Sequence, residues 1–262
     1  MKMVDFDNKC RHFFDSFLLF YTGWNKGQSG KVELKRQHCL RVSELSGKIA
    51  ASLRLEVEEV ALARIIGLLH DLGRFPQLLK YNTYDDSISG DHAAMAIDEM
   101  EHASLLQGID PEFAHLIKVA VYQHNKQELP ENLSHREKLF CNILRDADKL
   151  DNLDEITSHG AYTSTIDHLA PHWNLPRGKG ISEQVATAVK SGKSVTREDL
   201  RTYDDFKVMQ LSWVYDLNFK ASFRILTHGR YVDKIYGSLP KRDVVFDIYR
   251  IVRIYVENQF LN

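Results

Sequence analysis

Cysteine is scarce in this sequence. The 262 residues include three cysteines, Cys10, Cys39 and Cys141, an odd number spread widely along the chain. A small secreted domain held together by disulfides would need a denser and even set, and a cysteine-rich zinc site would need pairs at short spacing. We therefore expect three reduced thiols and neither of those two classes of protein.

Long hydrophobic runs are also missing. The most apolar stretch, FFDSFLLFYTGW at residues 13–24, is interrupted by Asp15 and is too short to cross a bilayer. The opening residues MKMVDFDNKC do not have the basic and then apolar pattern of a signal peptide. These absences lead us to expect a soluble protein of the cytoplasm that has no membrane partner.

Neither sign of charge dominates the sequence. Lysine and arginine total 34 against 36 aspartates and glutamates, and the formal net charge is -2. The charges are mixed along the chain, so the sequence predicts no strongly basic face, and nucleic acid is not an expected partner. Nothing in the sequence indicates the oligomeric state.

Apolar residues recur at helical spacing over most of the chain, while strand-like alternation is rare. A hydrophobic content of 44% is enough for a sizeable core. The pattern predicts an all-α fold, with a turn-rich loop at 81–92. The expected helices cover residues 9–22, 33–54, 57–71, 92–107, 111–124, 134–153, 203–226 and 242–259.

No internal repeat, low-complexity tract or clear boundary divides the sequence. We expect one all-helical domain over residues 1–262, with a core at 33–155 and a helical C-terminal elaboration at 156–262. The pattern weakens over 155–198, where HLAPHWNLPRGKGIS contains two prolines and two glycines. A lid over a substrate is our hypothesis for that segment.

The motif LLHDLGRF at residues 68–75 is the first sign of a functional site. An apolar helix ends there on His70 and Asp71, and Gly73 and Pro76 follow as stop signals. A titratable side chain at a core-facing position costs free energy unless it is paired or bound to a metal. Imidazole and carboxylate together are ligands for Mn, Fe, Co, Ni or Zn ions.

Further residues of the same two kinds lie at or near apolar helical faces: His38, His92, His124 and Asp148. With His70 and Asp71 they make a chemically complete set for two divalent ions. One ion would be bound by His38, His70 and Asp148, the other by His92 and His124, with Asp71 shared between them.

Some assignments stay open at this point. Asp148 competes with Asp146 and Asp151 for its role, and Asp151 could instead cap a helix or pair with a charge. The remaining histidines are interpreted as ordinary core or surface residues: His12, His102, His115, His135, His159, His168, His172 and His228.

Five motifs in order, KRQHCLRV, GLLHDLGRF, GDHAAMA, VYQHNK and LRDADKLD, resemble those of the HD-domain superfamily of metal-dependent phosphohydrolases. The resemblance covers roughly residues 33–155 and implies an all-helical fold with a central metal site. It implies the common ligands His38, His70, Asp71 and Asp148, while His92 and His124 match the extra histidines of two-metal members. The tandem histidines and GYP signature of the cyclic di-GMP phosphodiesterases are absent, so that activity is not expected.

The expected reaction is hydrolysis of a phosphomonoester or phosphodiester of a small molecule, such as a nucleotide. A metal ion lowers the pKa of bound water from about 16 toward 7 and so provides hydroxide as the nucleophile. Asp71 and Arg74 are the candidate catalytic residues, and the Arg74 guanidinium matches a phosphate in bidentate fashion. Lys126 and Lys149 are further candidates for substrate binding, or else solvated charges.

Two other functions fit the same residues. The ligand set also resembles that of the di-iron oxygenases of the inositol oxygenase type, because iron accepts the same donors. A catalytically inactive nucleotide sensor would retain the helices, although an intact set of six ligands argues against it.

Overall fold

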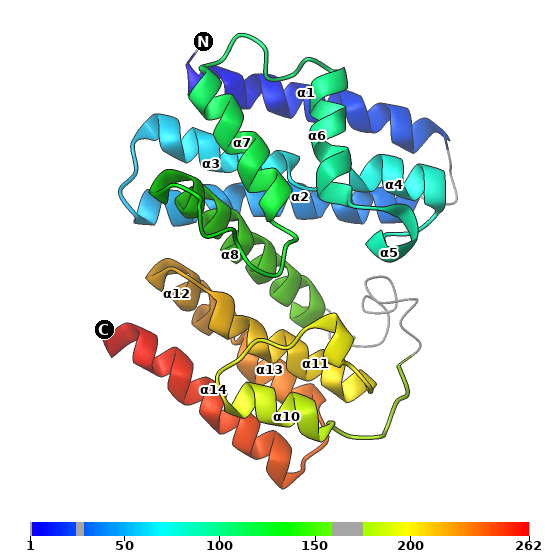
Figure 1. Cartoon of the computed structure of the whole chain (residues 1–262), viewed down its shortest axis with the longest axis vertical. Coiled ribbons are helices and arrows are strands. Elements are labelled where there is room, and N and C mark those ends of the chain that lie inside the picture. The colour runs from blue at the N-terminus through cyan, green and yellow to red at the C-terminus, as the bar shows by residue number, and fades with distance from the viewer. Residues whose placement is uncertain (1, 25–28, 159–174, 262) are drawn as a thin grey trace. The chain divides into compact units, whose positions relative to one another are not determined.

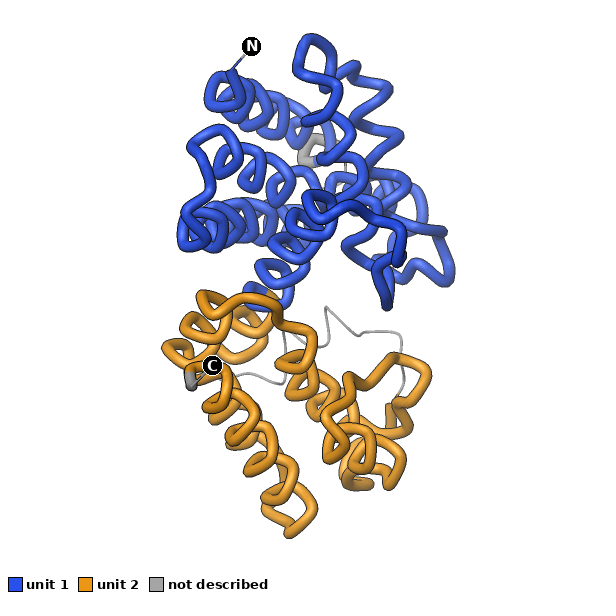
Figure 2. Tube along the Cα trace, turned by 60° about the vertical axis from the view of Figure 1, so that its left-hand side comes forward, with its two compact units in different colours: residues 1–151 blue, residues 152–262 orange. Residues whose placement is uncertain are grey.

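The computed structural model describes residues 2–24, 29–158 and 175–261, which form helices joined by turns and contain no strand. The all-α prediction is therefore confirmed. The chain divides into two compact units, Met1–Asp151 and Asn152–Asn262, coloured separately in Figure 2. The boundary falls inside one continuous helix, and the single-domain organisation expected from the sequence stays a prediction.

The first unit contains the helices that position the predicted site (Figure 1). They are α1 (Met3–Trp24), α2 (Ser29–Ser52), α3 (Val57–Leu69), α4 (Arg74–Tyr81), α5 (Asp86–Ser89), α6 (His92–His102), α7 (Pro111–Gln123) and the first part of α8 (His135–Ser158). Helix α3 is the most buried of them and packs against α1, α2 and α7. Its sequence is apolar apart from Glu58, Glu59 and Arg64, which is typical of a helix with most of its surface covered by others.

Two glycines allow the backbones of this unit to approach each other closely. A Cβ atom on Gly67 of α3 would lie 2.9 Å from the backbone of α2 at Ser43. A Cβ atom on Gly73, in the turn after α3, would lie 2.1 Å from the carbonyl oxygen of His92. The turn that contains His70 and Asp71 therefore rests directly on the N-terminus of α6.

The second unit contains the end of α8 and a group of shorter helices. They are α10 (Glu183–Lys190), η1 (Arg197–Asp199), α11 (Tyr203–Ser212), η2 (Trp213–Asp216), α12 (Lys220–His228), α13 (Tyr231–Ser238) and α14 (Asp243–Leu261). Helix α14 packs against α10, α12 and α13. Its buried stripe of Val245, Ile248 and Val252 has the three- and four-residue spacing that the sequence analysis used.

The prediction of one helix over 203–226 was wrong, because α11, η2 and α12 occupy that segment with residues 217–219 outside any helix. Leu217 is buried in an extended conformation, with φ -78° and ψ 138°. The Asn218 side chain donates to the carbonyl oxygen of Asp216 at 2.9 Å. Asparagine side chains compete for backbone hydrogen bonds in this way, which helical periodicity alone does not reveal.

Several shorter elements also differ from the prediction. Gly73 and Pro76 were expected to end a helix, but α4 begins there. Pro76 is tolerated because it lies in the first turn of α4, where backbone N–H groups make no hydrogen bond within the helix. Helix α5 lies inside the predicted loop, α6 ends at His102, and α13 was not anticipated. Within 155–198, residues 159–174 lie outside the described residues, so the lid hypothesis for that segment stays a prediction.

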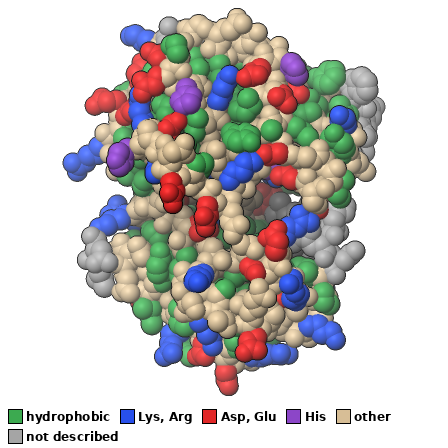
Figure 3. Space-filling model, viewed as in Figure 1, with side chains coloured by type: hydrophobic (Ala, Val, Ile, Leu, Met, Phe, Trp, Pro, Cys, Tyr) green, Lys and Arg blue, Asp and Glu red, His purple; other side chains and the backbone are tan. Residues whose placement is uncertain are grey.

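Three expectations from composition can be compared with the structure. Cys10, Cys39 and Cys141 are all buried free thiols. No helix in the described part of the chain combines the length and apolarity needed to cross a membrane. Acidic and basic side chains are interspersed on the face shown in Figure 3.

Candidate metal centre

All six predicted ligands lie in the first unit and converge on Asp71. His38 comes from α2, His70 and Asp71 from the turn after α3, His92 from the first residue of α6, His124 from the C-terminal cap of α7, and Asp148 from α8. The four histidines and Asp71 are buried, and the Asp148 side chain is 24% exposed. Residues distant in the sequence thus form one polar cluster within the hydrophobic core of the first unit.

Two histidines and Asp148 gather at one oxygen of Asp71. The Nε2 atoms of His38 and His70 each lie 3.6 Å from Asp71 Oδ2 and 3.3 Å from each other. Asp148 Oδ1 lies 3.1 Å from the Nε2 of His38 and 3.8 Å from that of His70. These atoms are close enough to bind a single ion.

The other two histidines gather at the second oxygen of the same carboxylate. The Nε2 atoms of His92 and His124 lie 3.3 Å and 3.8 Å from Asp71 Oδ1 and 3.0 Å from each other. Within the described residues, His38, His70 and Asp71 form one group able to hold a metal ion, and Asp71, His92 and His124 form another. Asp71 is common to both and offers a different oxygen to each.

Each of these histidines has an oxygen atom within hydrogen-bond distance of its Nδ1. The partners are Asp151 Oδ2 at 2.7 Å for His38, the Gly67 carbonyl at 2.8 Å for His70, Asp86 Oδ2 at 2.6 Å for His92 and the Val121 carbonyl at 2.6 Å for His124. Carbonyl and carboxylate oxygens only accept, so Nδ1 is the donor in all four cases. A neutral ring held in this way presents the lone pair of Nε2 toward Asp71, which is the usual arrangement of a metal-binding histidine.

The three aspartates that competed on α8 have different surroundings. Asp148 faces His38 and His70, as described above. Asp151 accepts from His38 and also pairs with Arg41, whose Nε and Nη2 lie 2.6 Å and 2.9 Å from its two oxygens. Asp146 is also buried, but it lies about 200° around the helix from Asp148 and therefore on nearly the opposite face. Asp148 therefore faces the histidine cluster, and Asp151 orients His38.

Comparison with protein families agrees with this geometry. Residues 36–153 match the family model of the HD domain, a stretch that includes all six clustered residues. This segment, less than half of the chain, is similar to the HD domain. HD domains bind divalent metals, and the superfamily consists mostly of metal-dependent hydrolases. Searches of curated proteins and of solved structures found no match to the chain.

Two cations lie beside the central aspartate of the cluster. Lys35 Nζ is 2.8 Å from Asp71 Oδ2, and Arg74 Nε is 3.4 Å from Asp71 Oδ1. The Nη1 atom of Arg74 donates to the Asp86 carboxylate at 2.9 Å and to the carbonyl oxygen of Tyr84 at 2.6 Å. Arg74 is thus close to the cluster and is held there by protein acceptors, and its role in binding phosphate stays a prediction.

The two predicted substrate-binding lysines lie next to the ligands in sequence. Lys126 pairs with Asp91, which caps the N-terminus of α6, and its ammonium lies 4.6 Å from the centre of the Tyr122 ring. Lys149 is a half-buried residue of α8 that follows Asp148 directly. A role for either lysine in substrate binding stays a prediction.

Burial and charge set the protonation of the cluster. Burial lowers the pKa of His70 to about 3 and that of His92 to about 4. Burial and the nearby charge of Lys35 also act to lower the pKa of His38. Hydrogen bonds to Asp148 and Asp151 outweigh them and raise this pKa to about 9.

The two carboxylates of the cluster remain ionised. Burial opposes ionisation of Asp71, but Lys35 and His70 hold its pKa well below the usual range. The hydrogen bond with His38 likewise lowers the pKa of Asp148 against the effect of burial. At neutral pH the cluster therefore contains two anionic carboxylates beside neutral His70 and His92, and a divalent ion would compete with the proton on His38.

Sequence reasoning missed Lys35 and Asp86. Lys35 precedes His38 by three residues on the same helix, a spacing that places two side chains on one face and could have identified it. Asp86 lies in a segment that the sequence predicted as loop, six residues before His92. No local spacing rule connects such a residue to its partner.

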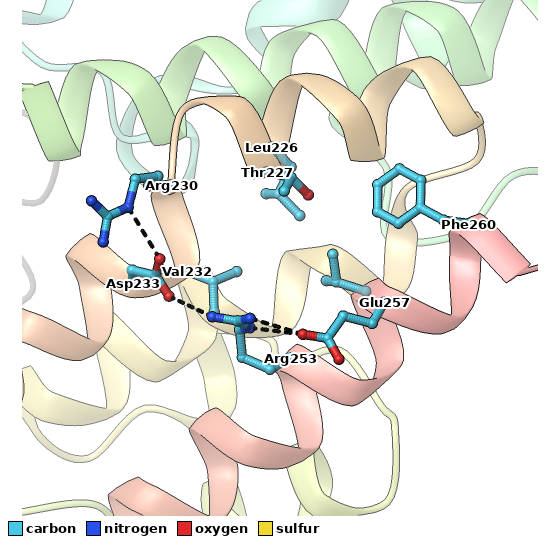
Figure 4. A pocket seen from close by; sticks show the side chains of 9 residues that line it. Leu226, Thr227, Arg230, Val232, Asp233, Arg253, Glu257 and Phe260 are labelled. Carbon is cyan, nitrogen blue, oxygen red and sulfur yellow. Dashed lines mark hydrogen bonds and ion pairs between the residues drawn. The ribbon is translucent and has the colours of Figure 1, made fainter.

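The second unit contains a separate cavity of about 200 Å³, shown in Figure 4. Its charged side chains pair with one another, since Arg253 bonds to Asp233 at 3.2 Å and to Glu257 at 2.8 Å, and Arg230 bonds to Asp233 at 3.3 Å. The residues that line it are Leu226, Thr227, Arg230, Val232, Asp233, Arg253, Val256, Glu257 and Phe260. The lining has no histidine or cysteine, and its two carboxylates are paired with arginines.

Proposed function

We propose that this protein is a phosphohydrolase that uses two divalent metal ions to cleave a small phosphate ester. The observation that carries the proposal is the division of four Nε2 atoms between the two oxygens of Asp71. A carboxylate that serves two pairs of imidazoles is the arrangement expected of a bridging ligand. The superfamily includes metal-dependent phosphohydrolases, which supports the same conclusion.

The donor set fits first-row divalent ions. His38, His70, Asp148 and Asp71 Oδ2 would hold one ion, and His92, His124 and Asp71 Oδ1 would hold the other. Imidazole and carboxylate are ligands common to Mn, Fe, Co, Ni and Zn. When bound, such a pair of ions supplies a nucleophilic water near neutral pH and neutralises charge on phosphoryl oxygens.

The protein's own groups have three tasks in this proposal. Asp71 holds the two positions together, while Asp151 and Asp86 keep the rings of His38 and His92 turned toward it. Arg74 places a permanent positive charge next to Asp71 Oδ1, where it can attract the substrate phosphate. We propose a phosphomonoester or phosphodiester of a small molecule such as a nucleotide as the substrate, and the cytoplasm as the location.

The test begins with metal content and redox state in one preparation. Protein purified without added metal is analysed by mass spectrometry and by EPR, then assayed on a panel of nucleotides and other phosphate esters. About two ions per chain together with hydrolysis support the proposal. A mixed-valent di-iron signal with O₂ consumption would instead establish an oxygenase, and absence of metal after reconstitution would favour the inactive sensor.

Replacing the bridging carboxylate separates metal binding from folding. We expect Asp71→Asn to lose hydrolysis and to bind less than one ion per chain, because a neutral amide is a poor bridge between two cations. Its helical circular dichroism should match that of the wild type. Asp98→Asn, at an exposed position of α6, is the matched control and should keep both properties. Two ions per chain in Asp71→Asn would contradict the assignment.

A further inference from the structure

Lys35 carries a partly buried ammonium group with unused hydrogen-bonding capacity. Its side chain is 14% exposed, and its bond to Asp71 Oδ2 is the only one it makes to a protein acceptor within the described residues. A lysine ammonium has three N–H donors. Two donors are therefore left without a protein acceptor at a position where water is largely excluded.

Arg74, the other cation at Asp71, is held by several protein acceptors. Its Nη1 donates to Gln77, to the Tyr84 carbonyl and to Asp86. These acceptors fix the guanidinium in place. The Lys35 ammonium, in contrast, bonds to a single acceptor within the described residues, and that acceptor is Asp71 itself.

The position of Lys35 relative to the metal ligands is defined. Asp71 Oδ2 has Lys35, His38 and His70 around it, whereas Oδ1 has Arg74, His92 and His124. The ring of Tyr84 lies 5.9 Å from both the Lys35 ammonium and the Arg74 guanidinium carbon. Each half of the cluster thus has its own cation, held against one aromatic ring.

We propose that Lys35 binds a non-bridging phosphoryl oxygen of the substrate and thereby makes the site selective for phosphomonoesters. This inference rests on the proposed function. Bound metal ions would neutralise the negative charge of Asp71 that Lys35 pairs with. The Lys35 ammonium would then lie beside the metal ions with N–H donors available for an anion. A phosphomonoester carries about two negative charges at neutral pH and offers three oxygens, whereas a diester carries one charge. A lysine, an arginine and two metal ions suit the more highly charged group.

The proposal predicts opposite changes in two affinities. In the metal-free protein the ammonium occupies an oxygen of Asp71 that a metal ion needs, so its removal should leave metal affinity unchanged or increase it. Phosphate should bind more weakly, because it loses a charge-assisted hydrogen bond. A residue that merely holds Asp71 in place would lower both affinities.

The experiment compares Lys35→Met with Lys35→Arg and with Lys48→Met, an exposed position on the same helix. Metal-loaded protein is titrated calorimetrically with inorganic phosphate, and metal-free protein with Mn²⁺. We expect Lys35→Met to weaken phosphate binding by about 10-fold to 100-fold without weakening Mn²⁺ binding. Lys35→Arg should retain most of the phosphate affinity because it keeps the charge, and Lys48→Met should behave as wild type.

Kinetics on a matched pair of esters test the substrate class. Wild-type protein should prefer p-nitrophenyl phosphate to bis(p-nitrophenyl) phosphate in kcat/KM, and Lys35→Met should reduce that preference. Unchanged phosphate affinity in Lys35→Met, weakened Mn²⁺ binding, or a wild-type protein that does not bind phosphate would each overturn the role of Lys35. A wild-type protein that binds phosphate through Lys35 but hydrolyses no ester would instead overturn the proposed function.

Discussion

At the scale of single residues, the four histidines of the proposed metal centre differ in what holds their Nδ1 atoms. His70 and His124 donate to carbonyl oxygens three residues earlier on their own helices, so their orientation is a local property. His38 and His92 donate to the carboxylates of Asp151 and Asp86. One carboxylate-oriented ring therefore lies on each side of Asp71, and the two sides can be perturbed separately.

We expect Asp86→Asn to weaken one ion and Asp151→Asn to weaken the other. In each variant the new amide has two possible orientations. If its nitrogen faces the Nδ1 of the histidine, it donates to Nδ1, and the ring proton moves to Nε2, where it blocks the metal. If the amide is turned the other way, its nitrogen faces Arg74 or Arg41. Loss of such a partner typically costs about 10-fold to 100-fold in metal affinity. Calorimetric titration with Mn²⁺ would resolve two binding events, of which each variant should weaken a different one. Equal loss of both ions in either variant would contradict two separate positions.

At the scale of elements, the turn after α3 lies close against the backbone of α6. Gly73 has an ordinary helical φ of -69°, so its need for glycine comes from its neighbours and not from its own backbone angles. The carbonyl of His92 and the amide nitrogen of Ala96 lie 2.1 Å and 2.6 Å from where a Cβ would be. This contact sets the distance between Asp71 and His92.

Gly73→Ala should destabilise the protein and loosen the ion held by His92 and His124. Overpacking of this kind costs about 1–3 kcal/mol or more, because backbone atoms must move. Urea denaturation and Mn²⁺ titration would measure the two effects. Gly237→Ala is the control, since apart from its own helix backbone no atom of the described residues lies within 4 Å of that Cβ position in α13. This change should stabilise the helix by up to about 1 kcal/mol. Equal stability of the two variants would show that α6 can shift freely.

Helix type was predictable wherever periodicity was strong and uninterrupted. The apolar stripes of α2, α3 and α14 are local properties of their sequences, and these helices lie close to where they were expected. The segment over 203–226 failed because Leu217 is buried in an extended conformation, which preserves an apolar pattern while interrupting the helix. Periodicity reports which residues are buried, and tertiary packing decides the backbone between them.

At the scale of the whole molecule, the proposed metal centre depends on long-range contacts. The bond between His38 and Asp151 joins residues 113 positions apart. Unfolding separates such groups, so their protonation is coupled to stability. Below pH 6.5, the ordinary pKa of histidine, His70 and His92 gain protons when the chain unfolds but stay neutral in the folded protein until about pH 3 and pH 4. His38 behaves oppositely, keeping its proton in the folded protein up to about pH 9.

The metal-free protein should therefore be most stable near pH 6.5. As the pH falls from 6.5 toward 4, the unfolded chain gains protons on His70 and His92 that the folded protein does not bind. The free energy of unfolding therefore decreases by at most about 1.4 kcal/mol per pH unit for each of the two groups. As the pH rises from 6.5 toward 9, the contribution of protonated His38 is lost. Urea denaturation in EDTA across this range measures the profile. His70→Asn should flatten the acid side, and His12→Asn, at an exposed position, should not. Stability that keeps rising to pH 8 would contradict the profile.

Periodicity and composition are local properties, so they were enough to predict the helical class and the kinds of residue available for a metal centre. The order of His38, His70, His92 and His124, typical of an HD domain, could also be read from the chain alone. The packing of the helices sets which oxygen of Asp71 serves which pair of histidines. It likewise separated Asp148 from Asp151 and brought Lys35 and Asp86 into the centre. The physical reason is that the direction of a side chain around its helix, and what it meets there, depend on the packing of segments distant in the chain.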